Sequence, residues 1–154
     1  MLELEPAMTY RLDVRGPLEG EGAKTDSGPR RQFWEMTRAT LEGPRVKATT
    51  PMSGFDWFTP HGNGYGRPHV RIPFRTDDGA VLLLEYRGIV HATDAFNRAV
   101  ANNTSTAWDD QYMRMALMFD TSATKYQWLT QSLFLARGRL LAAMSLEYDV
   151  YRVR

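Results

Sequence analysis

The stretch Arg71–Gly79, which reads Arg-Ile-Pro-Phe-Arg-Thr-Asp-Asp-Gly, decides the fold class of this chain. Polar and apolar residues alternate along it as far as an Asp-Asp-Gly turn, and an apolar run, Val81–Leu84, begins almost immediately afterwards. Alternation with a period of two on both sides of a turn that tolerates positive φ is typical of a β-hairpin. The sequence therefore predicts two antiparallel strands joined at Asp77–Gly79, where turn chemistry alone accounts for the two aspartates.

The same alternation extends over most of the chain. In Met8–Val14 the apolar side chains fall on one face, as expected for a half-buried strand. Thr93–Asn102 predicts a short helix with Asp94 placed to cap it, and Gly16–Pro29 predicts a long loop. Further strands are expected at Gln32–Thr40, Arg45–Thr50, Phe55–Thr59, Arg67–Arg75, Ala80–Val90, Met113–Phe119, Tyr126–Ala136 (which begins as a helical turn) and Leu140–Val153.

Hairpin-connected strands in this number predict an all-β fold that closes into an antiparallel β-barrel. Closure removes the sheet edges that would otherwise pair with other chains. We expect a single β-barrel domain over residues 1–154, with about eight strands and one short helix. A barrel of eight strands is just wide enough either to be filled by its own side chains or to hold one small ligand.

The composition excludes several classes of function. The chain has 154 residues and no cysteine, which rules out disulfides and thiolate chemistry. Its net charge of +1 indicates no nucleic-acid or membrane partner. No apolar run approaches the roughly 20 residues that a membrane span needs. Glu3 and Glu5 stand where a signal peptide would carry basic residues, so we expect a cytoplasmic protein.

An ordered series of motifs resembles the domain of unknown function 3237 family. The motifs are Met8–Val14, Leu41–Lys47, Gly54–Trp57, Arg75–Gly79, Tyr112–Thr121 and Tyr126–Leu129. The resemblance implies a small β-barrel, similar in outline to allene oxide cyclase and dirigent barrels. Those relatives bind apolar or phenolic ligands in the barrel mouth and steer cyclisation or coupling without a cofactor. Met115 and Leu117 stand where the family has Thr and Pro, which predicts a more apolar cavity if that face points inward.

Three residues are candidates for acid–base catalysis because each brings an ionisable group into an apolar strand. Asp56 lies among aromatic residues. Either it locks the turn from Gly54, or burial raises its pKa and makes it a general base. Glu85 interrupts an apolar strand, and a buried, protonated glutamate would be a general acid. Tyr86, its neighbour on the opposite face, is the other candidate proton donor.

Three more residues are candidates for binding a substrate. Trp57 would provide an aromatic platform beside Asp56. The planar guanidinium groups of Arg71 and Arg114 would hold a carboxylate, a phenolate or a developing negative charge. Arg71 shares its strand face with other basic residues, so a solvated outer face is the alternative interpretation.

No cofactor or metal motif accompanies these residues. His61, His69 and His91 lack the spacing of a metal site, so we expect neither a metal nor a cofactor. The predicted function is a cofactor-independent lyase, isomerase or cyclase that acts by acid–base chemistry on a small, partly aromatic or oxygenated metabolite. The alternatives are a non-catalytic carrier of a small ligand and a structural barrel filled by its own side chains. The aromatic and methionine content predicts a homo-oligomer, either a dimer or a trimer.

Overall fold

The hairpin predicted around Asp77–Gly79 is formed by strands β6 (His69–Thr76) and β7 (Val81–His91). Gly79 has a φ of +89°, and the backbone N–H of Thr76 donates to the carbonyl of Ala80 at 2.8 Å. Asp78 stabilises the turn, because its carboxylate accepts hydrogen bonds from Thr76 and, at 2.8 Å, from the Tyr126 hydroxyl. The sequence prediction is confirmed for this element.

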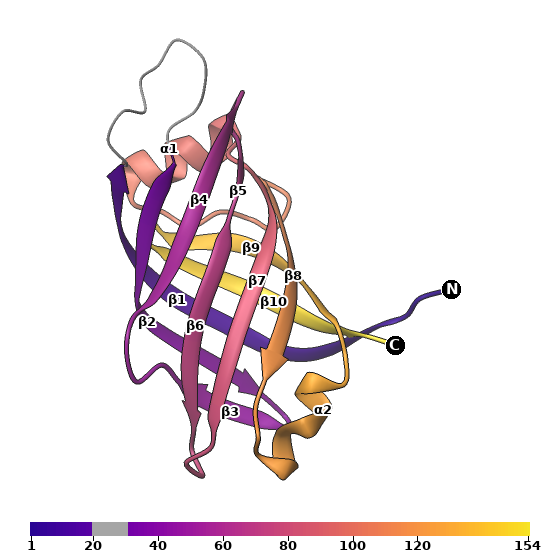
Figure 1. Cartoon of the computed structure of the whole chain (residues 1–154). Coiled ribbons are helices and arrows are strands. Elements are labelled where there is room, and N and C mark those ends of the chain that lie inside the picture. Colours follow the sequence, from indigo (N-terminus) through magenta and orange to yellow (C-terminus); the bar gives the residue numbers. More distant parts are fainter. Residues whose placement is uncertain (20–30) are drawn as a thin grey trace.

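The computed structural model describes residues 1–19 and 31–154, and in it the strands close into one antiparallel β-barrel (Figure 1). β1 pairs with β10 on one side and with β2 on the other, which completes the ring. The ring consists of β1 (Leu4–Glu19), β2 (Gln32–Gly43), β4 (Gly54–Gly62), β6, β7, β8 (Tyr112–Asp120), β9 (Phe134–Ala142) and β10 (Ser145–Val153).

Over the described residues the sheet has ten strands, because two short strands join the eight of the ring. The first of them corresponds to the strand predicted at Arg45–Thr50. β3 (Val46–Thr49) fills the gap between β2 and β6 at one end of the barrel. β5 (Tyr65–Arg67) does the same between β4 and β7 at the other end.

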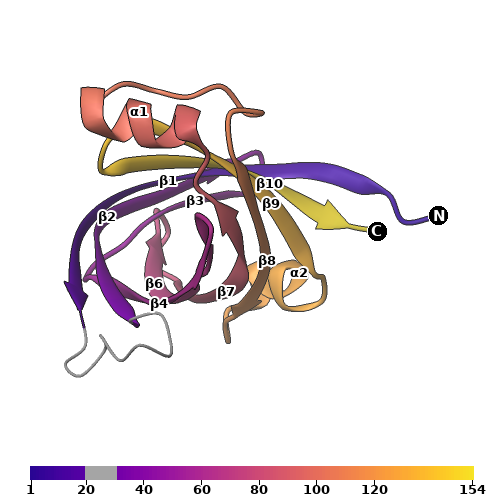
Figure 2. The ribbon, with the colours of Figure 1, turned by 90° about the horizontal axis from the view of Figure 1, so that it is seen from above.

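Helix α1 (Asp94–Asn102) lies at one end of the barrel, and the short helices η1 (Thr124–Tyr126) and α2 (Gln127–Thr130) lie near the other (Figures 1 and 2). The predicted helix is confirmed, but Thr93 rather than Asp94 caps it, because the Thr93 hydroxyl accepts from the Phe96 N–H at 3.2 Å. In the described part of the chain, none of the helices has the length and hydropathy needed to cross a membrane.

Several predicted boundaries differ from the structure, and three of the differences change the secondary structure assigned to a segment. β1 extends to Glu19, so the start of the predicted Gly16–Pro29 loop is strand, and residues 20–30 lie outside the described residues. The predicted Tyr126–Ala136 strand is helical until Thr130. Leu140–Val153 is two strands joined by a tight turn at residues 143–144, which the sequence did not signal because no glycine or proline marks it.

Inward-facing side chains fill the half of the barrel on the side of α2. This core includes Leu41, Phe74, Leu82, Leu84, Phe119 and Phe134 from the strands, and Tyr126 and Leu129 from η1 and α2 pack against it. The apolar face of β8 points inward as the alternation predicts, with Met113, Met115 and Leu117 all buried. The half on the side of α1 is hollow, and this is where the candidate site lies.

Candidate functional site

A cavity of about 270 Å³ lies inside the barrel at the end that α1 covers. Its walls are largely apolar, because strands present every second side chain to the barrel interior. The strands contribute Leu12, Val14, Trp34, Met36, Phe58, Val90, Met113 and Leu146, while Pro68, Phe96, Val100, Ala143 and Met144 come from α1 and the connecting segments. The polar side chains that reach the cavity are Gln32, Asp56, Tyr86 and Tyr148.

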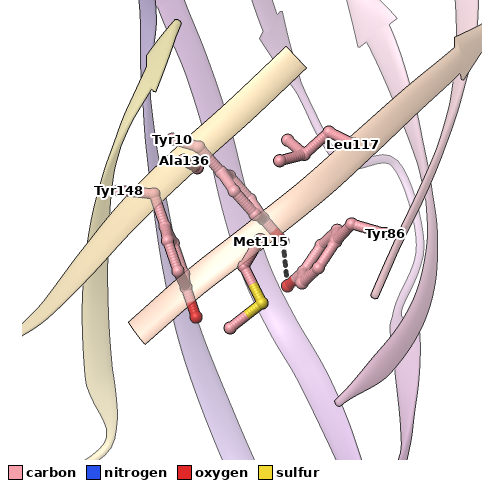
Figure 3. A pocket seen from close by; sticks show the side chains of 6 residues that line it. All are labelled: Tyr10, Tyr86, Met115, Leu117, Ala136 and Tyr148. Atoms are coloured by element: carbon pink, nitrogen blue, oxygen red, sulfur yellow. Dashed lines mark hydrogen bonds between the residues drawn. The ribbon is translucent and has the colours of Figure 1, made fainter. Parts of the chain in front are cut away.

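A layer of three tyrosines separates this cavity from the filled half of the barrel (Figure 3). Tyr10 and Tyr148 are cross-strand partners on β1 and β10, and their rings stack with centroids 5.6 Å apart. The hydroxyls of Tyr10 and Tyr86 lie 3.3 Å apart and share a hydrogen bond. Met115 and Leu117 contact this layer from β8. Tyr86 and Tyr148 therefore present hydroxyl groups at the floor of the cavity.

Asp56 is a buried carboxylate in the wall of the cavity. It lies on β4, between Trp34 of β2 and Val70 of β6, and is 8% exposed. One of its oxygens accepts a hydrogen bond from the backbone N–H of His69 at 2.9 Å. Burial raises the pKa of Asp56 to about 7, and this hydrogen bond opposes the shift. Asp56 therefore exchanges a proton near neutral pH, as a general acid or base requires.

Unlike Asp56, the three tyrosines do not titrate near neutral pH. Burial raises the pKa of Tyr10, Tyr86 and Tyr148 far above the ordinary value, and the charge of Asp56 adds to the effect at all three. They remain neutral hydroxyl donors at every physiological pH. The cavity thus combines one group that titrates near pH 7, Asp56, with tyrosine hydroxyls that stay neutral. Asp56 is suited to transfer a proton, whereas the hydroxyls are suited to bind an oxygen atom of a ligand.

The structure brings two of the six predicted site residues to the cavity, Asp56 and Tyr86. Trp57 follows Asp56 on the same strand and points to the outer face, where it is 51% exposed and packs against Phe33. Adjacent residues of a strand face opposite sides of the sheet, so Asp56 and Trp57 cannot both line the interior. The interior placement predicted for Trp57 is wrong for this reason.

Glu85 and Arg71 also lie on the outer face, as cross-strand partners on β7 and β6. The Arg71 Nε lies 3.4 Å from the Glu85 carboxylate, which also interacts with His69 Nε2 at 2.9 Å. The hydrogen bond with His69 holds the pKa of Glu85 below its ordinary value. Glu85 is therefore ionised at neutral pH, and the expectation of a buried, protonated acid is wrong.

Arg114 occupies the outer face of β8. Its guanidinium lies 4.9 Å from the centre of the Tyr112 ring and donates to the carbonyl of Met113 at 3.0 Å. Neither Arg71 nor Arg114 reaches the cavity, so the placement of both as anion holders inside the barrel is wrong. For Arg71, the alternative of a solvated face is confirmed, since its side chain is 74% exposed.

Tyr148, Tyr10 and Trp34 are the site residues that the sequence did not single out. Each lies on the apolar side of a strand, where the pattern favours core packing over a site. For the two tyrosines, the hydroxyl group was the signal in the sequence that could have indicated a site, because a buried tyrosine needs a hydrogen-bond partner for its polar end. Within residues 1–19 and 31–154, no group of three His, Asp or Glu side chains is arranged to hold a metal ion.

Comparison with known proteins assigns the chain to a family. The family described as "Protein of unknown function (DUF3237)" matches residues 2–153. The chain belongs to this family. A UPF0311 protein of Clostridium acetobutylicum is 26% identical over 105 residues, which cover 68% of this chain and 66% of that protein.

Two solved structures show the same fold. A β-barrel-like protein from Acinetobacter baumannii is 26% identical and has a TM-score of 0.81, with 100% of this chain and 97% of that chain covered. A protein described as an enzyme from Penicillium herquei is 19% identical and has a TM-score of 0.69, with 100% and 94% covered. The DUF3237 chain described here is therefore an all-β barrel by sequence pattern, by structure and by comparison.

Proposed function

We propose that this DUF3237 protein is a cofactor-independent lyase, isomerase or cyclase that uses acid–base chemistry on a small, oxygenated and partly aromatic metabolite bound in the barrel. The observation that carries the proposal is Asp56, a cavity-lining carboxylate whose pKa burial raises to about 7. Keeping an ionisable group in an apolar cavity costs free energy, and such groups cluster at functional sites.

The groups on the cavity wall suit a proton-transfer step. Ionised Asp56 would take a proton from a carbon next to a substrate carbonyl, and the electron pair of that C–H bond would move to the carbonyl oxygen. The hydroxyls of Tyr86 and Tyr148 would donate hydrogen bonds to this developing oxyanion. Asp56 would then return the proton to a different atom of the same molecule, which is an isomerisation, or a leaving group on the next carbon would depart with its bonding electron pair, which is an elimination. In a ring closure, the enolate would instead form a bond to an electrophilic carbon of the same molecule, and the proton on Asp56 would pass to the atom that receives the displaced electron pair.

The comparisons support this proposal only at the level of the fold. The relative from Penicillium herquei is described as an enzyme, which is consistent with catalysis in a barrel of this type. The alternative function is a carrier that binds a small ligand without turnover. The largely apolar walls of the cavity favour that alternative, because they would retain an apolar ligand whether or not Asp56 reacts.

Proton exchange into a bound ligand separates the two functions. Native mass spectrometry against a panel of small phenols, ketones and enones would first identify compounds that the purified protein binds. Each bound compound would then be followed by NMR in D₂O with wild-type protein and with Asp56→Asn. An acid–base enzyme incorporates deuterium into, or converts, at least one compound, and Asp56→Asn slows this at least about 100-fold while still binding it.

The outer-face variant Asp120→Asn is the matched control, since Asp120 is an exposed carboxylate on β8. It should exchange deuterium at the wild-type rate. If the wild-type protein binds compounds but leaves all of them unlabelled and unconverted, the carrier function replaces the proposed one.

A further inference from the structure

Among the described side chains that line the cavity, the formal charge is negative only. Of the described side chains that line it, Asp56 is the only one with a formal charge, and none is Lys, Arg or His. The other titratable groups near Asp56 are the hydroxyls of Tyr86 and Tyr148 at the cavity floor and that of Tyr10 behind them. The site therefore offers hydrogen-bond donors and one negative charge.

The cations of the surrounding strands point away from the cavity. Arg71 on β6 pairs with Glu85, and Arg114 on β8 lies over Tyr112. On β9 and β10, Arg137 and Arg139 lie on the outer face as partners of Asp149 and Glu147. Strand alternation keeps these guanidinium groups on the solvent side, so they cannot turn inward to neutralise an anion.

We propose that the cavity selects an uncharged ligand of about two fused rings with a carbonyl or hydroxyl oxygen at one end, and that it excludes carboxylates and phosphates. This proposal rests on the cavity being the ligand site, as the proposed function requires. The ligand enters with its oxygen towards Asp56, Tyr86 and Tyr148, and its apolar body lies against Trp34, Met113 and Phe96.

Electrostatics accounts for the exclusion of anions from the cavity. An anion in this cavity would lose its hydration, gain only neutral hydroxyl donors and lie beside the carboxylate of Asp56. Burial of an unpaired charge is among the costliest events in protein energetics, and a neighbouring like charge adds to that cost. A ketone of the same shape accepts the same tyrosine hydrogen bonds without either cost.

The volume of the cavity sets the size of the ligand. An apolar cavity of roughly 150 Å³ holds one benzene ring. The present cavity of about 270 Å³ is therefore suited to a body of about two fused rings. Tyr86 and Tyr148 lie at its floor and Asp56 in its wall, and none of the other described side chains that line the cavity carries a charge, so a second charged group at the far end of the ligand would find no charged partner among them.

Three probes of one shape test the proposal. 2-Acetonaphthone, 2-naphthamide and 2-naphthoate carry the same ring system and differ only in a methyl, an amino or an anionic oxygen on the carbonyl carbon. Binding of each would be measured by isothermal titration calorimetry or tryptophan fluorescence at pH 8 and pH 5.5. For the wild-type protein at pH 8 we expect the ketone and the amide to bind at least about tenfold more tightly than the carboxylate, the discrimination that 1.4 kcal/mol provides.

Neutralising Asp56 should relax the discrimination. Asp56→Asn is expected to strengthen 2-naphthoate binding at pH 8 at least about tenfold and to change the ketone by less than about threefold. At pH 5.5, where Asp56 is mostly protonated, the wild-type protein should bind 2-naphthoate more tightly than at pH 8. Asp120→Asn, which removes an exposed outer-face carboxylate, should leave all affinities at the wild-type values.

The outcomes distinguish this inference from the proposed function. Equal affinity of the wild-type protein for ketone and carboxylate at pH 8, or a discrimination that is as large in Asp56→Asn as in the wild-type protein, overturns the inference even if Asp56 proves catalytic. No binding of any probe overturns it too. The expected discrimination without deuterium exchange in any ligand supports the inference and assigns the protein as a carrier of neutral ligands.

Discussion

Asp56 owes its chemistry to its position in the alternation of β4. Gly54 and Asp56 point inward, while Phe55 and Trp57 point outward. The cross-strand neighbours of Asp56 are Trp34 and Val70, which shield the carboxylate without pairing with its charge. The backbone N–H of His69 is the hydrogen-bond donor that the structure gives it. A carboxylate in this environment titrates near neutrality instead of near its ordinary value.

Asp56 also makes the stability of the protein depend on pH. Its pKa rises from 3.8 to about 7 on folding, so the folded protein binds more protons than the unfolded chain between these two pH values. The contribution of Asp56 to the free energy of unfolding is therefore fully present below pH 3.8 and falls as the pH rises to about 7. With about 1.4 kcal/mol for each pKa unit, the loss is at most about 4 kcal/mol.

We expect Asp56→Asn to remove this dependence. Chemical denaturation at pH 4 and pH 8 should show that the variant becomes more stable relative to wild type as the pH rises. The difference should grow by up to about 4 kcal/mol. Asp120→Asn serves as the control, because its carboxylate is exposed on the outer face. A stability difference between Asp56→Asn and wild type that stays constant over this range would contradict the raised pKa.

At the scale of the strands, glycines on the inner face create the space that the aromatic side chains of the site occupy. Gly138 on β9 is the cross-strand partner of Tyr148, and a Cβ at Gly138 would lie 2.5 Å from Cε1 of the Tyr148 ring. Gly66 on β5 makes room for the ring of Phe58 on β4, whose Cζ would lie 1.9 Å from an added Cβ, although the cross-strand partner of Gly66 on β4 is Pro60. The missing side chain on one strand thus sets the position of a cavity ring on its neighbour.

Gly138→Ala should therefore displace Tyr148 and alter the cavity floor. Overpacking of this kind typically costs about 1–3 kcal/mol of stability. We expect a lower midpoint of denaturation, a changed near-ultraviolet circular dichroism spectrum and weaker binding of 2-acetonaphthone. Lys47→Ala on β3 is the control, since its side chain is exposed and exposed substitutions usually stay within about 0.5 kcal/mol. Wild-type affinity in Gly138→Ala would show that the Tyr148 position does not matter for the ligand.

For the whole molecule, the tyrosine layer divides the barrel into two parts with different tasks. Between the layer and α2, large apolar side chains fill the interior and stabilise the fold. Between the layer and α1, the same alternation leaves a cavity, because Val14 and Val90 provide smaller side chains, and α1 contributes Phe96 and Val100 to the lining at that end. One closed sheet therefore provides both a packed core and a ligand cavity.

Formation of a homo-oligomer, a dimer or a trimer, remains a prediction made from the sequence. Leu83, Met118, Leu133 and Leu135 are large apolar side chains that are exposed on or beside the outer face of β7, β8 and β9. We expect a dimer or trimer in light scattering, and we expect Met118→Lys to shift it towards the monomer, because Met118 is 63% exposed at the centre of this group. A wild-type monomer at micromolar concentration would contradict this expectation.

The amino-acid sequence by itself determined the all-β class, most strands and the hairpin at Asp77–Gly79, since these depend on local alternation and turn chemistry. It also singled out Asp56 and Tyr86, which the structure places at the cavity. The alternation already implied that Asp56 and Trp57 lie on opposite faces, so the prediction of both in one pocket could have been corrected without a structure. The hairpin between β9 and β10 was missed because the residues at its turn carry no turn signal.

Only the tertiary structure decided which face of each strand points into the barrel and which side chains meet there. Closure of the ring brings Tyr10 of β1 beside Tyr148 of β10 and places both near Asp56 of β4, although these residues are far apart in the chain. The same closure turns Arg71, Glu85 and Arg114 outward. A period of two defines two faces of each strand, but burial by the other strands selects the inner one. That selection leaves Asp56 as the charged residue among the described side chains that line the cavity.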